Sequence, residues 1–99
     1  MLSTLVKDPN EKLDYTVDFG GWLEEDEEIT LALWSRSPTG ITIGSSSYAS
    51  SISSDGKRCT VWLESGTAGT EYTITVNVTT DNSPARIGER SFIVRVEDR

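Results

Sequence analysis

Apolar and polar residues alternate along residues 71–80, and this pattern rules out most folds open to a chain of 99 residues. Tyr72, Ile74, Val76 and Val78 are separated by single threonine or asparagine residues. Because neighbouring side chains of a β-strand point to opposite faces, a period of two predicts a strand with one face in a core. No window keeps the 3.6-residue period of an amphipathic helix. We therefore expect an all-β protein.

Shorter stretches of the same pattern occur along the chain, separated by turn residues such as Gly20-Gly21, Pro38-Thr39-Gly40 and Asp55-Gly56. The Ser-rich stretch 45–54 is expected to be a polar edge strand or a loop, and residues 81–88 a loop. Six or seven short strands in a chain of this length predict an antiparallel, immunoglobulin-like β-sandwich of about seven strands. The expected strands cover residues 13–19, 29–35, 59–64, 71–80 and 90–97, with another beginning at residue 41.

The domain is expected to span residues 13–99, after an extended N-terminal segment of residues 1–12.

Tyr72 follows a glycine turn at the start of the penultimate strand. Its hydroxyl can return to the preceding corner, as in immunoglobulin-like folds, or Tyr72 can be a plain core aromatic. In residues 29–35 both faces are partly apolar, which fits a central strand or a strand with a bulge before Trp34.

Composition excludes several classes of function. Histidine is absent, which removes the catalytic relays that need imidazole and the commonest metal ligand. Nine basic residues against sixteen acidic ones give a net charge of −7, which argues against binding nucleic acid. No apolar run approaches the roughly 20 residues of a membrane span. We expect no enzymatic activity, no cofactor or metal, and no nucleic-acid or membrane partner.

The most acidic segment is Glu24-Glu25-Asp26-Glu27-Glu28. Its carboxylates could bind a divalent cation, but the spacing of a calcium loop is missing. We interpret the run as a solvated loop that deters edge pairing. Neutralising Glu25 and Glu27 together is therefore expected to leave stability unchanged or slightly raised.

Cys59 and Trp62 lie on opposite faces of the strand expected at 59–64. Cys59 shares the parity of the core residues and is expected to be a buried, inert thiol. Trp62 should face outward with Thr60 and is a candidate contact residue, unless a loop covers it or the strand faces the other way. Trp22 and Trp34 are expected to be core or rim aromatics. The candidate partner-contact residues are Trp62, Thr60, Trp22, Leu31, Leu33, Glu25 and Glu27.

The order and spacing of segments 7–15, 61–72 and 90–96 resemble small proteins of tailed bacteriophages called fiber-tail adaptor proteins. The motifs are Lys7-Asp8-Pro9, Val61-Trp62-Leu63 and the final strand Arg90 to Val96. The resemblance covers residues 7–99 and implies a non-enzymatic virion component, assembled in the host cytoplasm, that joins tail fibres to the tail. It implies an immunoglobulin-like sandwich and a symmetric, multi-copy assembly with tail, fibre or connector proteins. The acidic run and the Leu31/Leu33 pair depart from that pattern.

The alternative is an immunoglobulin-like module that binds carbohydrate or another surface, with exposed aromatic rings stacked on sugars. A copy number fixed by symmetry in purified virions would favour the adaptor, whereas retention of the isolated domain on a glycan array would favour the alternative. The copy number, the contacted virion protein, the host and any cation bound by residues 24–28 are left open by the sequence.

Overall fold

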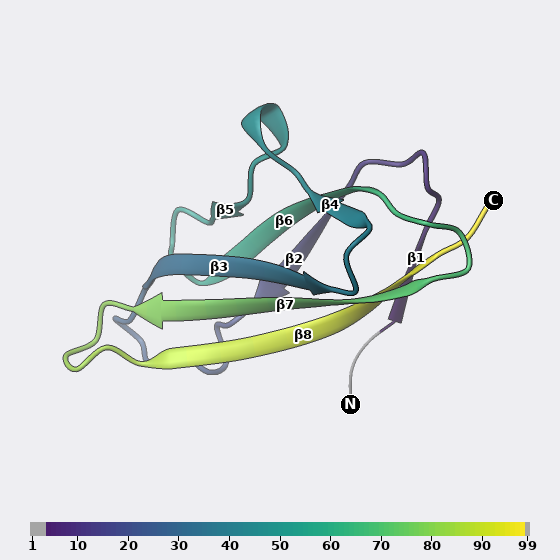
Figure 1. The fold of residues 1–99 in the computed structure, drawn as a ribbon. Coiled ribbons are helices and arrows are strands. Elements are labelled where there is room, and N and C mark those ends of the chain that lie inside the picture. The colour runs from purple at the N-terminus through teal and green to yellow at the C-terminus, as the bar shows by residue number, and fades with distance from the viewer. Residues whose placement is uncertain (1–3, 99) are drawn as a thin grey trace.

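The computed structural model describes residues 4–98, apart from the side chain of Ser46, and shows eight strands and one short 3-10 helix (Figure 1). The all-β prediction is confirmed, with one strand more than the seven expected. The elements are β1 (Thr4–Lys7), β2 (Leu13–Asp18), β3 (Ile29–Ser37), β4 (Ile41–Ile43), η1 (Ser46–Tyr48), β5 (Ser51–Ile52), β6 (Arg58–Ser65), β7 (Glu71–Thr80) and β8 (Ile87–Val96).

The strands form two sheets with a core between them. Sheet A has the order β1-β8-β7-β3, and sheet B has the order β2-β6-β4, with β5 also paired to β6. Every pairing is antiparallel except that of β1 with β8, which is parallel and places Thr4 opposite Ile93. The prediction of a wholly antiparallel sandwich is therefore wrong at this pair. Part of the N-terminal segment, residues 4–7, forms an edge strand of sheet A.

Lys7 is the residue that fixes β1 against the rest of the domain. Its side chain is fully buried, and Nζ donates hydrogen bonds to the carbonyls of Ser65 (2.6 Å) and Asp8 (2.9 Å). Burial lowers the pKa of Lys7 because it disfavours the charged form. The two carbonyl acceptors allow the ammonium group to be buried at the end of the parallel pair.

The core follows the alternation predicted from the sequence. In β7, Tyr72, Ile74, Val76 and Val78 are at most 1% exposed. The inward residues of β6 and β8 pack against them, and the outward positions are mostly threonine, asparagine or charged residues. The predicted parity of β6, β7 and β8 is confirmed.

Cys59 lies in this core with no exposed surface, and burial raises the pKa of its thiol to about 11. At neutral pH the thiol is therefore protonated and shielded from solvent, so it is a poor nucleophile. We expect a maleimide to leave the folded protein unlabelled and to react with one thiol per chain once urea unfolds it. Mass spectrometry of the protein labelled with and without urea measures the reaction. Equal labelling in the two conditions would contradict the buried position.

The ambiguous segment around residue 30 is an edge strand with a bulge. The register of β3 against β7 shifts between Ile29 and Leu31, so one extra residue reverses the parity of the strand. Ile29 is buried before the bulge, whereas after it Ala32 and Trp34 face inward and Leu31 faces solvent. The bulge interpretation is confirmed, and the central-strand interpretation is wrong because β3 ends the order of sheet A.

Tyr72 performs both of the roles that its sequence position allows. Its ring is 1% exposed in the core, and its hydroxyl oxygen accepts a hydrogen bond of 2.9 Å from the backbone N–H of Thr67 in the preceding turn. Gly66 has a φ of 103°, and a Cβ at this position would lie 2.7 Å from Val96 Cγ2. Glycine is therefore required where the turn passes over the end of β8.

Candidate functional site

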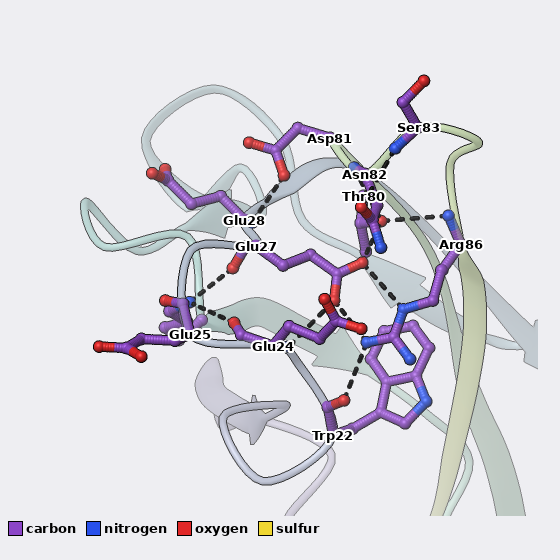
Figure 2. Close-up of polar contacts among 11 residues, drawn as sticks. Trp22, Glu24, Glu25, Glu27, Glu28, Thr80, Asp81, Asn82, Ser83 and Arg86 are labelled. Atoms are coloured by element: carbon purple, nitrogen blue, oxygen red, sulfur yellow. Dashed lines mark hydrogen bonds and ion pairs between the residues drawn. The ribbon is translucent and has the colours of Figure 1, made fainter.

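The acidic segment 24–28 packs against the loop between β7 and β8 at one end of the sandwich, and Figure 2 shows the contacts. Glu27 is only 4% exposed. Its carboxylate accepts hydrogen bonds from Arg86 Nε (2.9 Å), from Arg86 Nη2 and from the hydroxyl of Thr80 (2.6 Å). The backbone N–H of Glu24 donates a further bond of 3.0 Å to the same carboxylate.

Arg86 holds the charge of Glu27 in place. Hydrogen bonds from the Arg86 guanidinium lower the pKa of Glu27 to about 2, and the Thr80 hydroxyl adds to the effect. The guanidinium also lies 4.4 Å from the ring centre of Trp22 and donates to the Trp22 carbonyl at 2.9 Å. Trp22 in turn covers Gly88, where a Cβ would lie 2.8 Å from the indole. These contacts therefore connect Trp22, the acidic segment 24–28 and residues 80–88.

The prediction of a solvated acidic loop is correct for four residues and wrong for Glu27. Glu24, Glu25, Asp26 and Glu28 are exposed, whereas Glu27 points inward to Arg86. The expectation that replacing Glu27 leaves stability unchanged therefore has no structural basis, because the change removes the buried partner of the Glu27–Arg86 ion pair. Among residues 4–98, no three acidic or thiol groups converge as metal ligands would.

Trp62 lies on the outer face of sheet B, as its parity predicts, and is half-buried. The ring of Tyr48 packs edge-on against it, with centroids 5.2 Å apart, and the N–H of Gly44 donates to the Trp62 carbonyl. Tyr48 therefore covers part of Trp62, the reversed orientation of the strand is wrong, and a role for Trp62 as a contact residue stays a prediction. Thr60 is half-buried on the same face, with its Oγ1 2.8 Å from that of Thr16.

The outer face of sheet A carries exposed large aliphatic side chains on β3 and at the start of β8. Leu31, Leu33 and Ile87 are 48%, 60% and 73% exposed. Leu31 lies opposite Thr79 in the ladder, and Thr79 lies opposite Ile87, so one cross-strand row joins Leu31 to Ile87. We call these three residues the aliphatic patch. Ile87 is not among the predicted contact residues because residues 81–88 were expected to form a loop. Its odd spacing from the inward-facing Phe92 nevertheless indicates that Ile87 faces outward.

The seven candidate residues thus fall into three regions rather than one site. Leu31 and Leu33 share the outer face of sheet A, and Trp62 and Thr60 share that of sheet B. Trp22 and Glu27 meet around Arg86 at one end of the sandwich, and Glu25 is exposed beside them. No helix in residues 4–98 is long and apolar enough to cross a membrane.

Comparison with known families gives a match to the family described as "Podophage GP4 fiber-tail adaptor protein gp77", over residues 7–95. A comparison with curated proteins finds no match. The family match covers far more than half of the chain and includes β2 to β7 entirely. The chain therefore belongs to the podophage fiber-tail adaptor family, as a non-enzymatic structural component of the phage tail and hence of the virion.

Proposed function

We propose that the adaptor joins its neighbours through the outer faces of its two sheets, one face to each neighbour. The observation that carries this proposal is the aliphatic patch of Leu31, Leu33 and Ile87 on sheet A. A protein that links fibres to a tail needs at least two separate contact surfaces. The two outer faces of a sandwich point in opposite directions, which suits such a link.

The aliphatic patch has the composition of a contact surface. Its side chains leave apolar area in water, whereas the neighbouring outward positions of the same rows are Thr79, Asn77 and Glu89. An apolar centre with a polar rim is typical of protein interfaces. The patch is therefore assigned to one neighbour in the tail.

The second surface is the aromatic pair of Trp62 and Tyr48 on sheet B. Lys12 lies 4.8 Å above the Tyr48 ring and 3.4 Å from the carboxylate of Glu64, so charged groups surround the rings. Tryptophan is enriched among residues that dominate binding energy. A sugar could stack on the same pair, and binding of the isolated domain to a glycan array would favour the carbohydrate-binding alternative.

We also propose that the fold is immunoglobulin-like and that several copies assemble symmetrically. The order β3-β7-β8 corresponds to the C-F-G sheet of that fold, and β2-β6-β4 corresponds to B-E-D. The contact from Thr67 to the Tyr72 hydroxyl resembles its tyrosine corner. Closed symmetry is the usual arrangement of homo-oligomers, so we expect the copies in one tail to be related by symmetry.

Two substitutions test the contact surfaces in particles. Ile87→Glu places a charge in the aliphatic patch, and Trp62→Ala removes the aromatic anchor from sheet B. Each variant should stay folded and lose incorporation, because an interface hot spot contributes about 2 kcal/mol or more, roughly thirtyfold in affinity. Ala85→Glu adds the same charge in an exposed loop and should incorporate normally.

The measurement is the copy number of adaptor and fibre in purified particles, by quantitative mass spectrometry, together with thermal unfolding of each isolated variant. Loss of the adaptor itself indicates that the changed face contacts the tail. Retention of the adaptor with loss of fibres indicates that it contacts the fibre. If Ile87→Glu folds and incorporates as well as Ala85→Glu, the aliphatic patch is not a contact surface.

A further inference from the structure

β3, nine residues long, forms one edge of sheet A, and among residues 4–98 its side away from β7 has no strand partner. Its ladder to β7 is regular from Leu31 to Ser37, after the bulge. Among residues 4–98, the backbone bonds of β3 go to β7, apart from one from Ile29 N–H to the Gly56 carbonyl. Every second residue of the regular part therefore directs its N–H and C=O away from the domain.

The features that usually block an exposed edge are missing from this part of β3. Such edges normally carry lysine, proline or a bulge. From Leu31 to Ser37 the bulge is already past, and the one charged residue is Arg36. A groove of about 260 Å³ separates Thr30, Leu31 and Ala32 from residues 50–52, and space is therefore open beside the first half of the edge.

We propose that two copies of the protein pair antiparallel along their β3 edges, around a two-fold axis at Leu33, to form one continuous eight-stranded sheet. This register places Leu33 opposite Leu33 of the second copy and Ala32 opposite its Trp34. It uses residues 31–35, which all lie in the regular part of β3. The leucines of both copies then form one apolar strip on the outer face.

The charges of the chain permit this pairing despite the net charge of −7. The two copies of Arg36 would lie six residue positions apart, roughly 20 Å along the strands. That separation exceeds the Debye length of about 8–10 Å at physiological salt, so their repulsion is screened. A second copy is a better occupant than an unrelated strand because the register places its own exposed Leu33 side chain directly beside that of the first copy.

The pairing rests on the multi-copy assembly proposed above, but it is measured on isolated protein. Light scattering coupled to size exclusion should show a concentration-dependent dimer. Leu33→Lys brings two like charges opposite each other and should weaken self-association roughly tenfold or more. Ile87→Glu, on the same face but two strands from the edge, should dimerise like the wild type.

Disulfide trapping tests the register directly. Leu33→Cys should form a disulfide-linked dimer under mild oxidation much faster than Ile87→Cys, although Ile87 is the more exposed position. Cys59 does not interfere because it is buried. A monomeric wild type at every soluble concentration, unchanged dimerisation of Leu33→Lys, or equal trapping rates would overturn the proposal. The particle assay of Ile87 and Trp62 decides the contact surfaces independently.

Discussion

Replacing Glu27 with alanine is expected to destabilise the domain more than any other single change in the acidic run. The substitution leaves the Arg86 guanidinium beside Trp22 without its carboxylate and removes the acceptor of the Thr80 hydroxyl. Thr80 is only 3% exposed, so its hydroxyl loses its acceptor in a buried position, and an unsatisfied buried polar group is destabilising. The midpoint of urea unfolding should fall clearly for Glu27→Ala.

The matched control is Glu25→Ala, which removes the same chemical group from an exposed position in the same run. Its midpoint should stay close to that of the wild type. A double variant, Glu27→Ala with Arg86→Ala, should lose less stability than the sum of the two single variants, because the pair acts as a unit. Equal midpoints for Glu27→Ala and Glu25→Ala would contradict the buried network.

The same carboxylate makes stability depend on pH. In the folded state the pKa of Glu27 is about 2, compared with an ordinary value of 4.5. Its contribution is fully present above the ordinary value and is lost as the pH falls toward 2, because the unfolded state binds the proton first. Glu27→Gln removes this titration, so its stability should vary less with pH between about 4.5 and 2 than that of the wild type.

In the hydrophobic core outside this network, Val76→Ala is expected to cost about 1.5–4 kcal/mol of unfolding free energy. Val76 has no exposed surface and lies in β7, which has neighbours on both sides. The truncated side chain leaves a cavity that two flanking strands keep from collapsing.

Thr75→Ala, one residue earlier, is the control for Val76→Ala. Thr75 faces the outer side of the sheet and is half-buried, and its hydroxyl lies 2.8 Å from that of Ser91. Loss of that hydrogen bond should cost about 1 kcal/mol at most. Urea unfolding of both variants should therefore give clearly separated midpoints, and coincident midpoints would show that the assigned faces of β7 are wrong.

The sequence was sufficient where a strand has one face in the core and one in water. In β6 and β7 every second residue is buried, and the inward position of Cys59 and the outward position of Trp62 follow from counting. In β3 the same counting gave two answers, because a single extra residue before Leu31 exchanges the faces. Such a bulge is visible only once the ladder partner is known.

The missed features depend on contacts between residues far apart in the sequence. Nothing local marks Thr4–Lys7 as a partner of β8, and lysine is an unusual residue at a buried position. Glu27 has the same chemistry as its acidic neighbours, and only the position of Arg86, fifty-nine residues later, selects it. Pattern analysis therefore predicted the sandwich but not the network that fastens its end.

The parallel pairing of β1 with β8 also determines how the domain responds to mechanical load. The chain enters sheet A at Thr4, beside Ile93, and leaves it beyond Val96, next to Lys7. Force applied between Thr4 and Val96 in opposite directions is therefore expected to slide β1 along β8 and to strain all of their hydrogen bonds at once. An antiparallel terminal pair would instead peel open one bond at a time, at a much lower force.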